Sequence, residues 1–349
     1  LEQAPSAVQA SAGYRYAVLV DRTSNAVDFL DGALWQEPHL DHFDIYEEAP
    51  RLLSYGVTGT RPTHVSKHEG QMAIFYDGLA ATDTSTATPA SVQVLTDADI
   101  TAQNLAPAEL SYTLNMHGVA LPRGEFLLAS VRRADADSTS TNPVLPDQVG
   151  VYHWHDGAYE EEEVFSETCA DLHGAAQNEN HIAFGCSDGV LLVEELGNVF
   201  AARKIANPAE LDAELRVGTL YGHEHSEQFI ALASAHGGTV AQWLSVDPEE
   251  GEMHLIDWQP VAEARALSHG FSFDGERFLV LDSQGYLTIF AAHEHDGHME
   301  WEQVSAIDIS KEDPADMPEG LRFTMTIAQN ANYAYIADPI AQHVLIIDL

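Results

Sequence analysis

Histidine recurs at one position of an internal repeat, and histidine is a metal-ligating residue. Three His-Gly pairs begin at His117, His173 and His269, and each follows a short apolar stretch. A second apolar stretch closes 13 residues after each histidine on a small or acidic residue: Ser130, Cys186 and Asp282. A histidine that is fixed in a repeated unit occupies an equivalent place in every copy. If the copies surround an axis, their imidazoles converge, and converging imidazoles can hold a metal ion.

Two further histidines extend this set. His64 precedes a stretch that closes on Asp77, again after 13 residues, whereas the register after His223 slips by one or two residues. Neutral imidazole is a preferred ligand of Zn²⁺, which is usually held in a tetrahedron. The predicted ligands are the repeated histidines: His64, His117, His173, His223 and His269. The alternative is that His-Gly is a favoured turn, with each ring hydrogen-bonded to nearby backbone.

A second group of histidines lies in expected loops. His293, His295 and His298 stand among acidic residues and predict a weak, exposed metal site, although a solvated acidic hairpin has the same composition. His153 and His155 are spaced by two. Because alternate side chains of an extended strand face one side, such a pair can chelate one ion.

The elements that would carry these histidines are short strands. The repeat has a period near 50 residues with several strands in each copy, which is typical of a β-propeller blade. We therefore expect an all-β propeller, with seven blades favoured and six or eight as alternatives. Residues 16–31 resemble residues 333–348, so we expect a closing blade that is shared by both termini. Residues 1–13 are expected to form a tail and residues 14–349 a single propeller domain.

Charge and hydropathy limit the classes of partner that we expect for this chain. The chain has 15 Lys and Arg residues against 55 Asp and Glu residues, a formal net charge of −40. A surface of this sign repels nucleic acid and anionic membranes, so we expect neither as a partner. No run of 18 apolar residues occurs, so membrane insertion is not expected. The sequence starts at Leu1 with a polar segment, which we interpret as a mature end left by a removed export signal.

The two cysteines are predicted to form a disulfide. A hairpin that turns near Gln177 and Asn178 would place Cys169 opposite Cys186. Such a bond indicates an oxidising compartment, and two free buried thiols are the alternative.

Taken together, these features resemble the AztD family of periplasmic zinc chaperones, which serve bacterial zinc ABC transporters. The resemblance covers most of the chain and depends on the combination of repeat, acidic charge and His-x-His loops. It implies tight Zn²⁺ binding and delivery to the transporter's solute-binding protein in the periplasm. It assigns the metal to His117, His173 and His269 first, then to His64 and His223. Members can carry a metal-binding N-terminal segment, whereas residues 1–13 contain no histidine.

Two other classes of function remain open. A zinc-dependent hydrolase or lactonase-like propeller would use three ligands and an open water position, with Glu69 or Asp171 as candidate bases. The sequence has no phosphate-binding loop or H-E-x-x-H helix, which makes a non-enzyme the favoured interpretation. A protein-binding propeller without metal is the third class.

Overall fold

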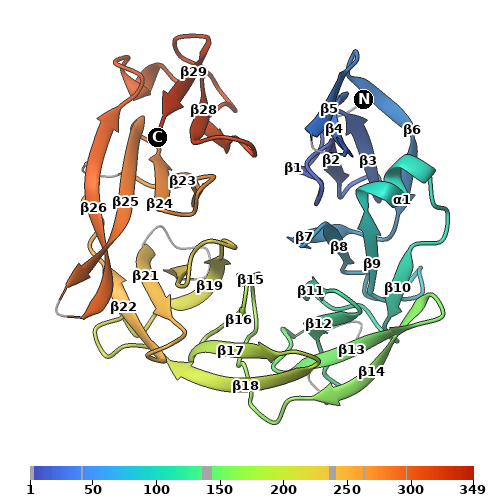
Figure 1. The fold of residues 1–349 in the computed structure, drawn as a ribbon. Coiled ribbons are helices and arrows are strands. Elements are labelled where there is room, and N and C mark those ends of the chain that lie inside the picture. Colours follow the sequence, from blue (N-terminus) through green and yellow to red (C-terminus); the bar gives the residue numbers. More distant parts are fainter. Residues whose placement is uncertain (1–3, 41, 136–143, 236–240, 262–263, 296) are drawn as a thin grey trace. The chain divides into compact units, whose positions relative to one another are not determined.

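Antiparallel strands make up nearly all of the regular secondary structure (Figure 1). The computed structural model describes residues 4–349 except 41, 136–143, 236–240, 262–263 and 296. Within these residues the helices are α1 (Asp97–Ala102) and the short 3-10 helix η1 (Pro314–Asp316), and neither could cross a membrane. The predicted all-β class is confirmed. Internal contacts divide the chain into two bodies, unit 1 (Leu1–Gly174) and unit 2 (Ala175–Leu349).

The first sheet of unit 1 has the strand order β1-β2-β3-β6. Its strands are β1 (Ala7–Ala10), β2 (Tyr16–Asp21), β3 (Ala26–Asp31) and β6 (Arg51–Thr58). Along β3 the side chains of Val27, Phe29 and Asp31 are buried and alternate with less buried ones. This period of two is that of a strand with one face on the core.

Strand β1 corrects the expectation that residues 1–13 form a tail. Ala7 to Ala10 pair antiparallel with Val20 to Ala17 of β2 and complete the sheet at its edge. An edge strand is held mainly by backbone hydrogen bonds, so it needs no strong apolar pattern. The sequence Ala-Val-Gln-Ala of β1 has only a weak one.

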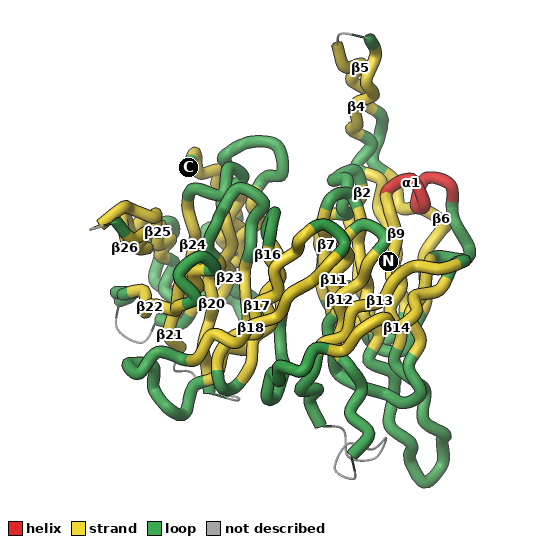
Figure 2. Tube along the Cα trace, turned by 60° about the horizontal axis from the view of Figure 1, so that its bottom comes forward, coloured by secondary structure: helices red, strands yellow, loops and turns green. Residues whose placement is uncertain are grey.

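A two-stranded hairpin is inserted between β3 and β6. It consists of β4 (Leu34–His39) and β5 (His42–Glu47), and Figure 2 shows it standing out from the rest of unit 1. Trp35 stacks on Tyr46 across the two strands, with ring centroids 5.1 Å apart. Phe43 and Ile45 are exposed along the hairpin. A cross-strand aromatic pair of this kind stabilises an otherwise unsupported ribbon.

Two more meanders complete unit 1. The strands of the first are β7 (Pro62–His68), β8 (Gln71–Tyr76), β9 (Ser91–Thr96) and β10 (Ala108–Ser111); those of the second are β11 (Ala120–Arg123), β12 (Phe126–Ser130), β13 (Val149–His155) and β14 (Ala158–Val164). A parallel bridge between Glu109 and Ala158 joins the meanders into one eight-stranded sheet. Helix α1 follows β9 and begins with a capping box, in which Thr96 and Asp99 bond reciprocally.

Unit 2 contains three four-stranded meanders and a three-stranded sheet. The strands of the three meanders are β15 (Ala175–Gln177), β16 (His181–Cys186), β17 (Gly189–Leu196) and β18 (Val199–Ala206); β19 (Arg216–Tyr221), β20 (Phe229–Ser234), β21 (Ala241–Asp247) and β22 (Glu252–Ile256); β23 (Ala266–Phe271), β24 (Arg277–Asp282), β25 (Tyr286–His295) and β26 (His298–Asp308). The last sheet consists of β27 (Thr324–Ile327), β28 (Tyr333–Asp338) and β29 (His343–Asp348).

The core of each unit lies between the faces of successive sheets. In unit 1, Val18 and Phe29 of the first sheet pack with Ile74 of β8, and all three are fully buried. In unit 2, Val190 of β17 and Phe229 of β20 share one buried cluster. Burying an aliphatic or aromatic side chain stabilises the folded state by about 1.5–3 kcal/mol, so these faces hold neighbouring sheets together.

Small antiparallel meanders that follow one another along the chain are propeller-like. The count of seven blades stays a prediction, and so does the single domain over residues 14–349. The expected closing blade shared by both termini stays a prediction as well. Strand β1 pairs with β2, where it supplies the fourth strand of the first sheet, and β27, β28 and β29 form a sheet of three.

Candidate metal centre

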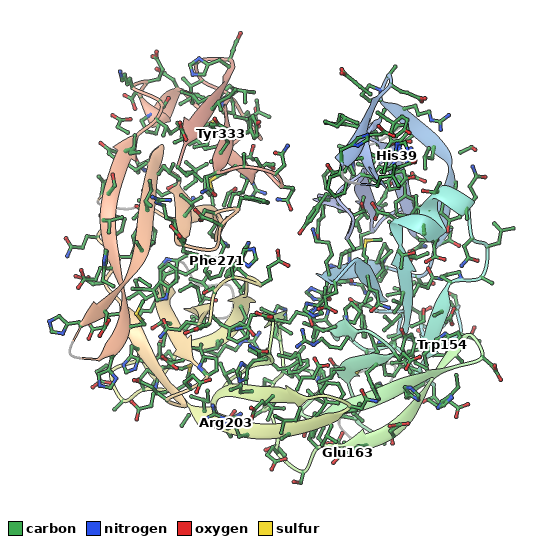
Figure 3. All side chains as sticks on the ribbon, in the orientation of Figure 1. His39, Trp154, Glu163, Arg203, Phe271 and Tyr333 are labelled. Atoms are coloured by element: carbon green, nitrogen blue, oxygen red, sulfur yellow. The ribbon has the colours of Figure 1, made fainter. Side chains whose placement is uncertain are left out.

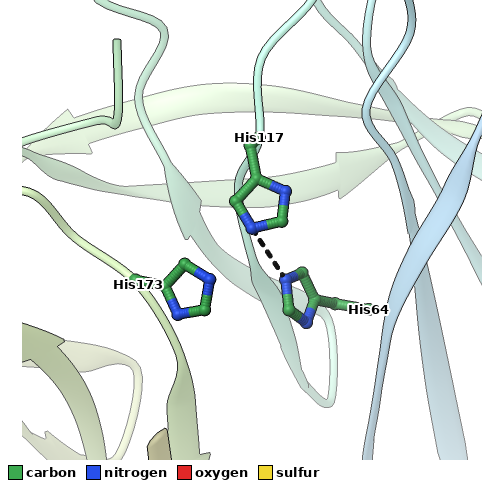
Figure 4. Close-up of side chains that lie close together, drawn as sticks. All are labelled: His64, His117 and His173. Atoms are coloured by element: carbon green, nitrogen blue, oxygen red, sulfur yellow. Dashed lines mark hydrogen bonds between the residues drawn. The ribbon is translucent and has the colours of Figure 1, made fainter. Parts of the chain in front are cut away.

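Three of the five repeated histidines meet in unit 1. One ring nitrogen from each of His64, His117 and His173 can be chosen so that all three atoms lie within 4.8 Å of one another. The ring centroids are 4.9 Å apart for His64 and His117, 5.1 Å for His117 and His173, and 5.9 Å for His64 and His173. Figure 4 shows the three rings gathered about one point. These residues are 53 or more positions apart in sequence, so the sheets bring them together.

The spacing of the ring nitrogens suits a tetrahedral ion. Nε2 of His64 and Nε2 of His117 are 3.3 Å apart. A Zn–N bond of about 2.0–2.1 Å in a tetrahedron separates two ligand nitrogens by about 3.3–3.4 Å. All three rings are half-buried. The three imidazoles therefore form a donor set that fits Zn²⁺ and leaves a fourth position for another ligand.

A β-bulge directs His64 toward the centre. In the pairing of β7 with β8, Pro62 lies opposite Tyr76 and His64 lies opposite Phe75, so Thr63 is an extra residue. A bulge of this kind inserts one residue into a strand and re-aims the side chains next to it. His64 directly follows the inserted residue.

Backbone contacts fix the segment that carries His117. The amide of Met116 donates to the carbonyl of Asp77, and the amide of Val119 donates to the Ser130 hydroxyl. Gly118 lies against Phe75, since a Cβ atom at this position would be 2.7 Å from the ring. The glycine of this His-Gly pair is therefore needed so that the chain can pass close to Phe75.

His173 is held by its neighbours in sequence. Leu172 is fully buried, and its amide donates to the carbonyl of Pro146. Asp171 and Gly174 both have positive φ, at 50° and 78°. A left-handed conformation on each side turns the chain sharply at His173, and a non-glycine residue such as Asp171 adopts it at a cost of about 1–3 kcal/mol.

Asp77 orients His117. Its Oδ2 atom lies 3.0 Å from Nδ1 of His117 and 3.0 Å from the Arg22 guanidinium. Because the carboxylate accepts, Nδ1 of His117 carries the proton, and Nε2 presents its lone pair toward His64. Sequence reasoning missed this role, although a signal existed: Asp77 is the acidic residue that closes the stretch after His64.

Burial keeps His64 neutral. Desolvation is the main cause that lowers the pKa of His64 to about 4, and the neighbouring His117 and His173 lower it further. A neutral imidazole has a free lone pair for a metal, so His64 stays available as a ligand across the neutral and mildly acidic range.

The other two predicted ligands belong to unit 2. His269 packs edge-on against Tyr221 and Trp243, with ring centroids 5.0 and 5.1 Å away, and burial lowers its pKa to about 4. Its Nδ1 atom is buried and has no hydrogen-bond partner among the described residues. His223 lies beside His225 and Phe271, which is labelled in Figure 3. The ligand role of both histidines stays a prediction.

The expected weak site on β25 and β26 is arranged differently. His295 pairs with His298 across the hairpin, but His298 contacts Glu250 in the neighbouring sheet, which raises the pKa of His298. His293 pairs with Glu300. Within the described residues, His293, His295 and His298 do not form a three-ligand group.

Three other groups of possible ligands do occur. Among the described residues, these groups are His39 with His42 and Asp44, His153 with His155 and Glu162, and His254 with Glu250 and Glu252. In the second group strand pairing brings in the carboxylate, because Glu162 lies on β14 and both histidines lie on β13.

Both cysteines are disulfide-bonded, in agreement with the predicted bond between Cys169 and Cys186. The hairpin register behind that prediction is wrong. Strand β15 pairs with β16 so that Ala175 lies opposite Phe184, and the turn spans Asn178 to His181. The turn is shifted because Asn178 caps it, with its side-chain oxygen accepting from the amide of His181.

The fold and the centre together define an all-β protein of propeller-like sheets with a three-histidine cluster. The chain is 26% identical over 224 residues to the zinc chaperone AztD of Citrobacter koseri, a match that covers 64% of this chain. The match covers 46% of that relative, so the chain spans about half the length of the curated relative it matches. This finding confirms the resemblance to the AztD chaperones. No protein-family model matches the chain.

Solved structures support the fold. Crystal structures of C. koseri AztD, including its apo form, align with a TM-score of 0.75 at 21% identity and cover 98% of this chain and 82% of theirs. The β-propeller domain of Cps50 (Swd1) from Myceliophteria thermophila aligns with a TM-score of 0.53 at 11% identity, covering 99% of this chain and 97% of that domain.

Proposed function

We propose that this chain is a periplasmic zinc metallochaperone that holds Zn²⁺ between His64, His117 and His173. The observation that carries the proposal is the convergence of the three imidazoles at a spacing that suits a tetrahedral ion. The similarity to AztD supports zinc as the cargo. Of the five repeated histidines, His223 and His269 are the additional proposed ligands.

The charges of the chain favour cation capture. A formal net charge of −40 raises the local concentration of divalent cations around the molecule. At the centre itself, the carboxylate of Asp77 offsets the guanidinium of Arg22, so that the neighbouring positive charge does not oppose the ion. Asp77 also strengthens His117 as a donor, since a carboxylate on the remote ring nitrogen raises the basicity of the coordinating one.

Delivery needs a partner that can reach the ion. The side chain of His117 is 29% exposed, so one ligand of the centre faces solvent. With three protein ligands, the fourth position is open to a ligand from a docked protein, which then replaces the histidines in turn. We propose that this partner is the solute-binding protein of a zinc ABC transporter, which places both proteins in the periplasm. The disulfide fits that oxidising compartment.

Zinc titration against a competing chelator tests the ligands. We expect His117→Ala and His173→Ala each to weaken Zn²⁺ binding at least about 100-fold, because each removes one of three donors. His225→Ala, an exposed histidine of unit 2, is the matched control and should bind as the wild type does. Unchanged tight binding in both cluster variants would exclude this centre.

Transfer is tested separately. Zinc-loaded chain is mixed with metal-free solute-binding protein, and the rate of zinc movement is compared with the rate of release to a small chelator. Faster movement to the protein supports direct handover through a docked complex. Equal rates mean that zinc is simply released into solution, and the chaperone role then fails.

A zinc hydrolase is the second candidate, because three histidines with an open fourth position also describe a catalytic zinc site. The carboxylate of Asp77, which contacts the cluster, is already bonded to His117 and Arg22, which leaves it poorly placed as a general base. Hydrolysis of ester or lactone substrates by zinc-loaded chain, lost in His117→Ala, would favour this class.

A further inference from the structure

We propose a second site for an imidazole-binding divalent cation on the strands β13 and β14, formed by His153, His155 and Glu162. The site is independent of the three-histidine centre and of the proposed chaperone role. One ligand atom from each residue falls in a single group whose atoms all lie within 4.8 Å of one another. Nδ1 of His153 lies 2.9 Å from Nε2 of His155 and 3.4 Å from Oε1 of Glu162.

Strand geometry brings the two imidazoles together. His153 and His155 are alternate residues of β13 and therefore project from the same face, while Trp154 projects from the other. Nδ1 of His153 and Nε2 of His155 are 2.9 Å apart, and the two rings are nearly perpendicular with centroids 4.5 Å apart. The ring of Phe126 stacks on His153 at 4.7 Å and fixes its orientation.

A β-bulge supplies the carboxylate. Val151 lies opposite Glu163 and Tyr152 lies opposite Glu161, so Glu162 is the extra residue of β14. Its Oε1 atom is 3.4 Å from Nδ1 of His153. Bulges commonly re-aim a side chain next to a functional site, and this one places a carboxylate beside two imidazoles.

The separations fit a small ion. Ligand atoms at about 3.3–3.4 Å from one another surround a tetrahedral centre with bonds of about 2.0–2.1 Å. The observed 2.9 and 3.4 Å bracket this value, so small side-chain rotations complete the set. Glu125, with Oε2 4.0 Å from Nε2 of His153, adds negative charge next to the group.

The donor set defines the class of ion. Two imidazoles and one carboxylate suit Zn²⁺, Ni²⁺ and Cu²⁺, whereas Ca²⁺ and Mg²⁺ prefer oxygen ligands. His155 and Glu162 are exposed, so the site exchanges its ion with solvent more readily than the half-buried centre does. Trp154, labelled in Figure 3, lies between the two histidines in sequence and is 43% exposed on the opposite face of the strand, so its fluorescence can report binding.

The test removes the three-histidine centre first. In a chain carrying His117→Ala and His173→Ala, titration with Zn²⁺ alone should still show zinc binding at this second site, and His155→Ala or Glu162→Gln should weaken that binding at least about 10-fold. Ni²⁺ should quench Trp154 fluorescence, and Trp154→Phe should remove most of that quenching without changing the affinity. Mg²⁺ should produce neither effect. His254→Ala, a histidine of another possible ligand group, is the matched control.

Two results would overturn the proposal. One is the absence of a remaining zinc site in the doubly substituted chain when circular dichroism shows that it is folded. The other is a remaining site that His155→Ala leaves unchanged. If the double substitution prevents folding, wild-type chain is titrated instead, and His155→Ala must then remove the weaker of two bound equivalents. Loss of the tighter equivalent alone in His155→Ala would contradict the assignment of the weaker site to His155.

Discussion

Asp77 and His117, which are 40 residues apart in sequence, share a hydrogen bond of 3.0 Å at the edge of the three-histidine centre. The bond fixes both the orientation and the protonated nitrogen of the ring. A carboxylate that closes one repeat therefore positions the histidine of the next.

Substitution of this carboxylate should weaken zinc binding without removing a ligand. We expect Asp77→Asn to lower Zn²⁺ affinity about 10–100-fold, because the amide keeps the shape but not the charge of the group. Chelator competition measures the change. Arg22→Gln is the control, since it removes the other partner of Asp77 and leaves the bond to His117. Equal affinities for Asp77→Asn and wild type would show that the bond has no part in binding.

Gly118 should tolerate no side chain. In Gly118→Ala the added Cβ lies 2.7 Å from the Phe75 ring and 3.1 Å from Met116. We expect a loss of about 1–3 kcal/mol in the free energy of unfolding and weaker zinc binding, because His117 is displaced. Gly270→Ala, the same substitution after His269, meets only the end of Ile327 at 3.2 Å and should cost less. Phe75→Leu should partly rescue Gly118→Ala, and no rescue would point to another cause.

The metal-free chain should lose stability as the pH falls from about 6.5 toward 4. Burial lowers the pKa of His64, His68 and His269 to about 4, so in this range the unfolded chain binds more protons than the folded one. Each unit by which a pKa is lowered corresponds to about 1.4 kcal/mol. Urea unfolding between pH 7.5 and 5 measures the effect.

One substitution should flatten this pH dependence. His269→Phe removes one of the three lowered groups and keeps a ring between Tyr221 and Trp243. We expect a smaller loss of stability on acidification than in the wild type. An unaltered slope in His269→Phe would contradict the assignment of His269 as a neutral buried group.

The disulfide should contribute a few kcal/mol to stability. Cys169 and Cys186 are 17 residues apart, and closing a loop of this length stabilises the folded state by about 3 kcal/mol. The double substitution Cys169→Ala with Cys186→Ala should therefore lower the urea midpoint, and a reductant should have no further effect on it. Wild-type chain should show no free thiol before reduction. A midpoint equal to that of the wild type would contradict this prediction.

Strand positions were largely predictable because apolar runs end at turn residues. The runs at residues 181–186, 277–282 and 333–338 match β16, β24 and β28 at both ends. The convergence of His64, His117 and His173 was also predictable, since equivalent positions of a repeat occupy equivalent places. Periodicity within one chain was enough for both inferences.

Bulges and cross-sheet contacts could not be predicted in the same way. Nothing in the sequence marks Thr63, which precedes His64, as an inserted residue. The same holds for Glu162 within a run of four glutamates. The aromatic surroundings of His269 depend on Tyr221 and Trp243 in other strands, and a count of intervals along the chain does not reveal them.

The three histidines come from separate segments of unit 1: β7, the connection before β11 and the connection after β14. An ion bound by all three would cross-link these segments. At a free ion concentration 100 times the dissociation constant, such a cross-link adds about 2.7 kcal/mol to the stability of the metal-bound chain. Zinc binding and release would then change the resistance of unit 1 to unfolding. Thermal denaturation or limited proteolysis could therefore distinguish the zinc-bound chain from the metal-free chain.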